Sequence, residues 1–195
     1  ILCFSCYLWN ISYVEGLGRE IPKILPGVKI CLCGPEVSYD AGETIQKYPQ
    51  VTGIIRGEGE ETFAELMAVY RGQSGGAHEL LKIKGLTFRD GDGSIVETKP
   101  RPVMDLSRVP FVYENIEDFQ NRIIYYESSR GCPFSCSYCL SSVDKCLRFR
   151  DISLVKRELQ FFIDHEVPQV KFVDRTFNCR HDHAMAVWSY IKEHD

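Results

Sequence analysis

Short apolar runs alternate with longer amphipathic segments over about the first 80 residues of the chain. The apolar runs cover residues 1–6, 28–33 and 53–56, and their length and their β-branched or cysteine-rich content are typical of buried parallel strands. Residues 60–70 carry the clearest helical stripe. A weaker helix is predicted over residues 14–25, which contain Gly16, Gly18 and Pro22. This alternation predicts an α/β fold with a parallel sheet covered by helices.

Polar residues that follow these strands are candidate ligand contacts. Ser5 lies near the end of the first run, Gly34 follows the second and Glu58 follows the third. Ligands of open parallel sheets bind beyond the carboxyl ends of the strands. Glu58 lies in a Gly57-Glu-Gly-Glu60 segment, and a tight turn with acidic residues near a helix N-terminus explains that segment equally well.

The pattern changes after about residue 80. Residues 85–89 and 94–98 flank Asp90-Gly-Asp-Gly93, which is a strong hairpin signal, and prolines follow. From residue 121 the order is strand, loop, helix, strand and helix. The first of these helices starts after Asp151, a plausible N-cap, and its apolar face carries Ile152, Val155, Leu159 and Phe162. This order predicts the first units of a β/α barrel, whose active site gathers at the carboxyl ends of the strands.

Composition excludes several classes of protein. The 195 residues carry a formal net charge of −4 with no run of like charges, so nothing indicates a nucleic acid as an electrostatic partner. No apolar stretch approaches the roughly 20 residues that span a bilayer. Nine cysteines without a signal-peptide pattern fit a reducing cytosol better than a disulfide framework. The start at Ile1, directly in a predicted strand, indicates a piece of a longer protein.

The most specific motif is Cys132-Pro-Phe-Ser-Cys136-Ser-Tyr-Cys139. Iron–sulfur cubanes normally take four thiolates, so three thiols with CxxxCxxC spacing suit a cluster with one iron left open. A zinc site completed by a distant residue and a loop of buried thiols are the alternatives. Zinc is disfavoured because Cys146 and Cys179 do not form the second CxxC pair that zinc knuckles use.

This motif, after a predicted strand and with an aromatic residue before its last cysteine, resembles the cluster motif of the radical S-adenosylmethionine enzymes. The resemblance implies that Cys132, Cys136 and Cys139 hold a 4Fe-4S cluster whose fourth iron binds S-adenosylmethionine. It implies that Tyr138 packs near the adenine. Reductive cleavage of the sulfonium would give methionine and a 5′-deoxyadenosyl radical that abstracts hydrogen from a substrate. An electron donor such as flavodoxin or ferredoxin is the implied partner.

The resemblance extends to the next strand. Phe172-Val-Asp-Arg-Thr-Phe-Asn178 is similar to the family segment that holds the amino group of S-adenosylmethionine, and Asp174 is the expected acceptor. Capping of the strand-to-helix turn is an equal alternative for Asp174. Arg150, with Arg148, lies where a cation could meet the methionine carboxylate, and solvated surface charges are the alternative. Capping or surface roles are favoured over metal binding for three residues with metal-like spacing: Cys179, His181 and His183.

A second resemblance covers the first part of the chain. The segments 3–10, 33–38 and 57–63 together resemble the second half of the cobalamin-binding domain found before many radical S-adenosylmethionine cores. In that family a serine after one strand and a Gly-Gly pair after the next line the pocket of the cobalamin nucleotide tail. The resemblance implies that Ser5 and Gly34 bind cobalamin, with Glu58 as a third contact. Cys33 stands where the family has the first glycine, and its Cβ and thiol would crowd a ligand. Buried structural thiols are expected, rather than a metal cluster, for Cys3, Cys6, Cys31 and Cys33, because alternation along strands sends neighbouring side chains to opposite faces.

The chain is therefore predicted to contain three parts. Residues 1–80 are the C-terminal half of a Rossmann- or flavodoxin-like cobalamin-binding domain, residues 81–120 a hairpin and proline-containing linker, and residues 121–195 the start of a partial TIM-type barrel. The predicted function is that of a cytoplasmic radical S-adenosylmethionine enzyme that carries out cobalamin-dependent methyl transfer or another radical modification of an unknown substrate. A non-catalytic iron–sulfur or zinc protein, serving electron transfer or structural binding, is the alternative. The isolated piece is expected to be inactive.

Overall fold

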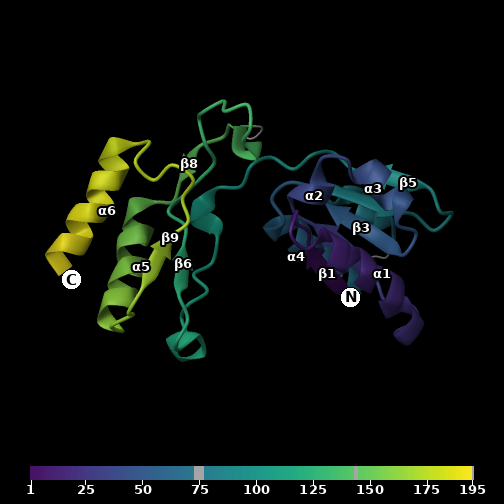
Figure 1. The fold of residues 1–195 in the computed structure, drawn as a ribbon, viewed down its shortest axis with the longest axis horizontal. Coiled ribbons are helices and arrows are strands. Elements are labelled where there is room, and N and C mark those ends of the chain that lie inside the picture. Colours follow the sequence, from purple (N-terminus) through teal and green to yellow (C-terminus); the bar gives the residue numbers. More distant parts are fainter. Residues whose placement is uncertain (73–76, 143–144, 195) are drawn as a thin grey trace. The chain divides into compact units, whose positions relative to one another are not determined.

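The structure is a computed structural model that describes residues 1–72, 77–142 and 145–194 (Figure 1). It divides the chain into two units, Ile1–Pro102 and Val103–Asp195. The first unit contains the predicted parallel strands and the hairpin, and the second contains the cysteine motif. Both units combine helices with parallel strand pairs, so the predicted α/β class is confirmed.

A five-stranded sheet in the order β1-β2-β3-β4-β5 forms the centre of the first unit. Its strands are β1 (Leu2–Ser5), β2 (Ile30–Cys33), β3 (Val51–Ile55), β4 (Leu86–Arg89) and β5 (Ile95–Glu97). The first three are parallel, whereas β4 runs antiparallel to β3 and β5 antiparallel to β4. The predicted hairpin thus adds two strands to this sheet, and the unit ends only at Pro102.

The helices of the first unit are α1 (Ile11–Ile24), α2 (Pro35–Ser38), α3 (Ala41–Lys47) and α4 (Glu60–Tyr70), with a short 3-10 helix at Ala77–Lys82. The bounds of α4 are those predicted from its stripe. The weaker pattern gives a regular helix, α1, that runs through both glycines and Pro22. Val14 and Gly18 of α1 are buried, and this packing outweighs the poor helix propensity.

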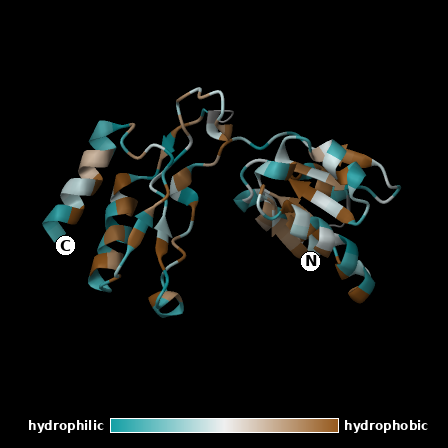
Figure 2. Cartoon of the chain, in the orientation of Figure 1, coloured by the Kyte–Doolittle hydropathy of each residue, from teal (hydrophilic) through white to brown (hydrophobic). Residues whose placement is uncertain are grey.

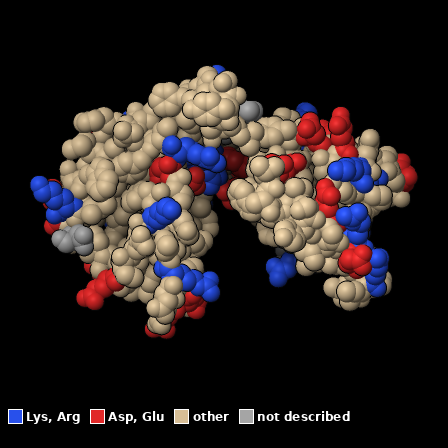
Figure 3. All heavy atoms as spheres, viewed as in Figure 1, with Lys and Arg blue, Asp and Glu red and all other residues tan. Residues whose placement is uncertain are grey.

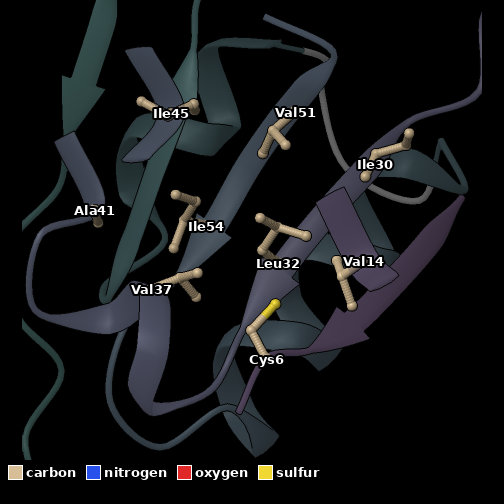
Figure 4. Packing of buried hydrophobic residues seen from close by; sticks show 9 residues of the cluster. All are labelled: Cys6, Val14, Ile30, Leu32, Val37, Ala41, Ile45, Val51 and Ile54. Carbon is tan, nitrogen blue, oxygen red and sulfur yellow. The ribbon is translucent and has the colours of Figure 1, made fainter. Parts of the chain in front are cut away.

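The sheet buries a hydrophobic cluster on each face. Figure 4 shows the cluster under α1, α2 and α3, in which the thiol of Cys6 points toward Leu32 among aliphatic side chains. The cluster on the other face lies under α4 and comprises Cys31, Ile55, Leu66, Leu80, Ile83, Leu86 and Phe88. Because β2 and β3 are buried on both faces, they are nearly continuous apolar runs, and Figure 2 shows hydrophobic residues along them.

The second unit contains two strand pairs and two long helices. Its elements are β6 (Ile124–Tyr126), β7 (Ser129–Arg130), β8 (Arg148–Phe149), α5 (Ile152–Asp164), β9 (Val170–Phe172) and α6 (His181–His194), with 3-10 helices at Leu106–Arg108, Ile116–Phe119 and Leu140–Ser142. β6 and β9 are parallel, and α5 connects them, as expected of a β/α barrel. β7 and β8 are antiparallel.

Capping and burial both place α5 where the sequence predicts it. The Asp151 carboxylate accepts hydrogen bonds from the backbone N–H groups of Ser153 at 2.8 Å and Leu154 at 3.4 Å. On the predicted apolar face, Val155, Leu159 and Phe162 are buried in one cluster that also contains Ile124 and Tyr126 of β6.

Glu158 is a charged residue on this apolar face, and it is 5% exposed. Its carboxylate forms a two-point ion pair with Arg150, with Nε···Oε2 at 2.9 Å and Nη2···Oε1 at 2.5 Å. Tyr126 donates its hydroxyl to Oε2 at 2.6 Å, and burial beside this carboxylate raises the pKa of Tyr126 far above its ordinary value. Nη1 of Arg150 donates to the carbonyl of Leu106 at 2.6 Å. The pair therefore joins α5, β6 and the segment before β6.

These contacts correct the expectation that Arg150 meets a ligand carboxylate or lies solvated on the surface. Its side chain is buried, and each guanidinium nitrogen already has an acceptor within the unit. Arg148 donates to the carbonyls of Met104 at 3.0 Å and Cys146 at 2.9 Å. A buried charge costs several kcal/mol unless it is paired, which explains why Arg150 and Glu158 occur together.

Charges of both signs are mixed on the visible face of each unit (Figure 3). On the face that Figure 3 shows, blue and red side chains are interspersed on both units without a large patch of one sign. Within the described residues, no helix has the length and hydropathy needed to cross a bilayer.

Replacement of Glu158 by Ala should lower the free energy of unfolding by about 3–5 kcal/mol, because it leaves the buried Arg150 charge without its partner. Urea unfolding followed by circular dichroism measures this change. The matched control is Glu20→Ala, which breaks an exposed pair with Lys23 and should cost less than about 1 kcal/mol. Equal losses in the two variants would contradict a stabilising role for the buried pair.

Candidate functional site

The cysteine motif lies on a closed loop at the carboxyl end of β6. β7 and β8 pair at the base of this loop, with Ser129 opposite Phe149 and Arg130 opposite Arg148. The chain between these strands carries Cys132, Cys136 and Cys139, so all three thiols belong to one loop whose ends are fixed.

Gly131 is the residue that allows the loop to close. Its φ is +94°, and a Cβ placed there would lie 2.3 Å from the carbonyl oxygen of Cys146. No side chain is compatible with that approach, because both the conformation and the space require glycine. The close contact keeps the backbone just before Cys132 against the backbone that enters β8.

The motif thiols face solvent to different degrees. Cys136 is exposed, whereas Cys132 and Cys139 are half-buried, and no disulfide joins any of the nine cysteines. Tyr138 is 90% exposed, so the adenine contact implied for it remains a prediction. Within the described ranges, no three His, Cys, Asp or Glu side chains are arranged to hold a metal ion. Three thiols are nevertheless the donor set of an iron–sulfur cluster, and metal ligands commonly gather only when the metal binds.

Asp174 lies two residues after the end of β9 and accepts hydrogen bonds from the two serines that follow β6. Ser128 donates its backbone N–H to Oδ2 at 3.2 Å and its hydroxyl to Oδ1 at 2.8 Å, and the hydroxyl of Ser129 also donates to Oδ1. The carboxylate thus joins the carboxyl ends of two parallel strands. It lies next to the base of the cysteine loop, because Ser129 belongs to β7.

His183 of α6 extends this network, contrary to the expectation of a capping or surface role. The imidazole is 2% exposed, and Nε2 lies 3.2 Å from the hydroxyl oxygen of Ser128. Phe149 packs on the ring with centroids 4.8 Å apart. Burial, and then the positive charge of Arg180, lower the pKa of His183 below its ordinary value. Cys179 and His181 are exposed, as expected.

The serine pair and His183 are site residues that sequence reasoning missed. Two adjacent serines directly after an apolar strand were a usable signal, since polar residues at carboxyl strand ends line such sites. No signal distinguished His183 from the exposed His181, because the difference depends on the packing of α6.

The carboxyl edge of the first unit holds Ser5, Cys33 and Gly34. Ser5 is exposed and lies opposite Cys33 on the neighbouring strand. The Cys33 thiol is turned onto β1, where it donates to the carbonyl of Phe4 with Sγ···O at 3.5 Å. The side chain is therefore directed toward β1, and the crowding expected from a cysteine in place of glycine stays a prediction. Ser5 is exposed at the same edge, where the nucleotide tail is expected.

Gly34 serves the fold of this edge. Its φ is +98°, and a Cβ would lie 2.5 Å from the carbonyl oxygen of Cys6. Cys6 donates its N–H to the carbonyl of Cys33 at 2.6 Å, so the loop after β1 is held against the end of β2. Glu58 is half-buried in the turn between β3 and α4, and its proposed contact with a ligand remains a prediction.

Cys3, Cys31 and Cys33 lie on one face of β1 and β2, because they occupy paired or alternate positions. Cys31 and Cys6 are buried as expected, but Cys3 is exposed. A hydrogen bond with the Cys3 thiol and a weaker one with Ser5 lower the pKa of Cys33 to about 7, although burial opposes the shift. The same contact raises the pKa of Cys3.

Comparison with known proteins shows what the two units resemble. Residues 1–67 match the family model described as B12 binding domain. The chain is 26% identical over 191 residues to 2-(S-pantetheinyl)-carbapenam-3-carboxylate methyltransferase of Streptantibioticus cattleyicolor, covering 91% of the chain and 27% of that protein. It is also 26% identical over 190 residues to the cobalamin-dependent radical SAM methyltransferase TokK of Streptomyces tokunonensis, again covering 91% of the chain and 27% of the relative.

A solved structure shares the fold. The cobalamin-dependent S-adenosylmethionine radical enzyme OxsB, solved with aqua-cobalamin and S-adenosylmethionine, superposes with a TM-score of 0.75 at 16% identity. The match covers 99% of the chain and 28% of OxsB. The chain therefore spans about a quarter of the length of the relatives it matches.

Gly131→Ala should destabilise the protein more than a glycine replacement that causes strain alone. Gly57→Ala is the matched control, because Gly57 has φ +72° with nothing within 4 Å of its Cβ position, so only the conformational cost of roughly 1–2 kcal/mol applies. Gly131→Ala should cost about 1–3 kcal/mol more, since backbone atoms must move. Urea unfolding measures the free energy of unfolding of both variants. Equal losses would mean that the backbone around Cys146 moves away from the new Cβ at little cost.

Cys33 should react with iodoacetamide at a rate that rises with pH through a midpoint near 7, since the thiolate is the nucleophile and the pKa is lowered to about 7. Cys3→Ala removes the main stabilising contact and should move the midpoint toward the ordinary value of roughly 8.5. Mass spectrometry of the labelled peptides gives both midpoints. An unchanged midpoint in Cys3→Ala would show that Cys3 does not activate Cys33.

Proposed function

We propose that the chain comes from a cobalamin-dependent radical S-adenosylmethionine enzyme, because residues 1–67 match the B12 binding domain model and its relatives include a cobalamin-dependent radical SAM methyltransferase. Its reaction would be methyl transfer, the activity named for its relatives, or another radical modification of a substrate of unknown identity.

One observation carries the proposal. The first of the three thiols in the closed loop lies three residues after Ser129, and Ser129 donates its hydroxyl to the Asp174 carboxylate. A thiolate set for a cluster and an acceptor for an amino group therefore come from adjacent parallel strands. A purely structural loop would not need a carboxylate fastened at its base, whereas a bound amino acid cofactor would use one.

Each residue of this group has a distinct task in the proposal. Cys132, Cys136 and Cys139 would hold a 4Fe-4S cluster and leave one iron for S-adenosylmethionine. When bound, the cluster would supply the electron for reductive cleavage of S-adenosylmethionine to methionine and a 5′-deoxyadenosyl radical. Asp174 would accept a hydrogen bond from the methionine amino group, and Tyr138 would cover the adenine. A flavodoxin- or ferredoxin-like donor would provide the electron.

The first unit would bind cobalamin at its carboxyl edge. Ser5 and the backbone around Gly34 would contact the nucleotide tail, and Glu58 would lie in the turn after β3 at the same edge. Support comes from the exposed position of Ser5 at this edge and from the match of residues 1–67 to the B12 binding domain model.

Anaerobic reconstitution with iron and sulfide, followed by electron paramagnetic resonance, tests the function. The reduced protein should give a 4Fe-4S signal that S-adenosylmethionine perturbs, and the Cys132→Ala/Cys136→Ala/Cys139→Ala variant should give none. Cys179→Ala is the matched control, because it removes an exposed thiol outside the motif and should leave the signal intact.

Two results would overturn the proposal. A cluster that ignores S-adenosylmethionine would favour a non-catalytic iron–sulfur protein. Tight zinc binding without sulfide would favour a structural metal site.

A further inference from the structure

The network around Asp174 contains a buried histidine that no step of the proposed reaction uses. His183 Nε2 lies 3.2 Å from the Ser128 hydroxyl oxygen, and that hydroxyl lies 2.8 Å from Asp174 Oδ1. Ser128 is fully buried, so neither contact competes with bulk water. Three side chains from the ends of β6, β9 and α6 thus form one continuous chain of hydrogen bonds.

The direction of these hydrogen bonds follows from the chemistry of the groups. An ionised carboxylate only accepts, so Ser128 must donate its single hydroxyl hydrogen to Asp174. The oxygen of Ser128 is then an acceptor, and His183 must donate to it from Nε2. Burial lowers the pKa of His183 and so favours the neutral imidazole, which then has its hydrogen on Nε2 and a lone pair on Nδ1.

The other ring nitrogen of His183, Nδ1, lowers the stability of this arrangement. His183 Nδ1 is buried and has no hydrogen-bond partner among the described residues. An unsatisfied buried polar atom costs stability, and an aliphatic side chain at this position would avoid that cost. Packing alone does not explain a histidine here, but its hydrogen bond to Ser128 does.

The hydrogen bond from His183 holds the Ser128 hydroxyl in place, and this hydroxyl in turn holds the Asp174 carboxylate. Asp174 Oδ1 accepts from both serine hydroxyls and Oδ2 accepts from one backbone N–H, so three of about four acceptor positions are filled within the described residues. The remaining position is on Oδ2. A Ser128 hydroxyl free to rotate would let the carboxylate turn, whereas a donor from His183 holds the hydroxyl toward Oδ1.

We propose that His183 is a positioning residue, which acts through Ser128 to hold the Asp174 carboxylate in the orientation that accepts a hydrogen bond from the amino group of S-adenosylmethionine. This inference rests on the proposed function of Asp174. His183 itself touches no ligand in this arrangement.

A double-mutant cycle in the full-length reconstituted protein tests the inference, with S-adenosylmethionine affinity measured from the perturbation of the cluster signal. His183→Leu should weaken binding about fivefold to tenfold, the effect of one net hydrogen bond. In a Ser128→Ala background the same replacement should have little effect, because the connecting hydroxyl is gone. Ser129→Ala is the matched control, since it removes a bond to Oδ1 that does not involve His183 and should leave the His183→Leu effect unchanged.

Conservative replacements separate positioning from packing. His183→Gln places an amide N–H near the position of Nε2 and should bind S-adenosylmethionine within about twofold of the unmodified protein. His183→Asn is too short to reach Ser128 and should behave like His183→Leu. If Gln and Asn variants bind equally, or if His183→Leu lowers only the unfolding temperature, His183 has a structural role alone.

The cluster-free protein gives a second readout. Burial and Arg180 lower the pKa of His183, while Asp174 and Asp182 oppose them. The unfolded histidine therefore takes up a proton before the folded one, and stability should fall as pH decreases below about 6.5. His183→Gln should lack this component, and parallel pH profiles would contradict the buried neutral histidine. Unmodified protein that fails to bind S-adenosylmethionine would instead overturn the proposed function, and this inference with it.

Discussion

The buried ion pair of Arg150 and Glu158 is the interaction on which the second unit depends. The Arg150 guanidinium donates to the Glu158 carboxylate on α5 and to the carbonyl of Leu106. Tyr126 of β6 donates its hydroxyl to the same carboxylate. The backbone N–H of Arg150 also donates to the carbonyl of Ser128 at 2.9 Å. One residue therefore fixes the packing of the helix and the position of the serine that bonds to Asp174. The geometry of the site follows from an electrostatic requirement of the core.

Both units have a glycine with positive φ and a close main-chain contact at their carboxyl edges. Gly34 and Gly131 each have a positive φ, and each allows one backbone segment to approach another more closely than any Cβ would permit. In the first unit this contact holds the loop after β1 against β2, and in the second it closes the cysteine loop. Main-chain contacts of this kind leave side chains such as Ser5 and Cys136 exposed, because they are not needed to hold the loops.

Local sequence patterns predicted the helices and strands better than they predicted the contacts between them. The stripe of α4 and the Asp151 cap of α5 depend on neighbours in the sequence, so both were predictable. The turn chemistry predicted the hairpin of β4 and β5, but its pairing with β3 is a long-range contact that no local pattern encodes. Arg150 was misplaced for the same reason, since nothing in the sequence shows that Glu158 on the next helix is its partner. The cysteine motif could be read from its spacing alone, and its role as a cluster ligand set stays a prediction.

The two halves of the candidate site are prepared for ligands in different ways. Asp174 is held by two serines and, through Ser128, by His183, so its orientation is set before any ligand arrives. The three thiols share a loop with fixed ends, but they are not gathered into a metal-binding arrangement in the part of the chain that the structure describes. A cluster binds by forming strong bonds to its ligands and can draw a loop together with the energy of those bonds. A hydrogen bond from an amino group to the Asp174 carboxylate is worth only about 1.5–3 kcal/mol, and such a weak contact requires an acceptor that is already in position.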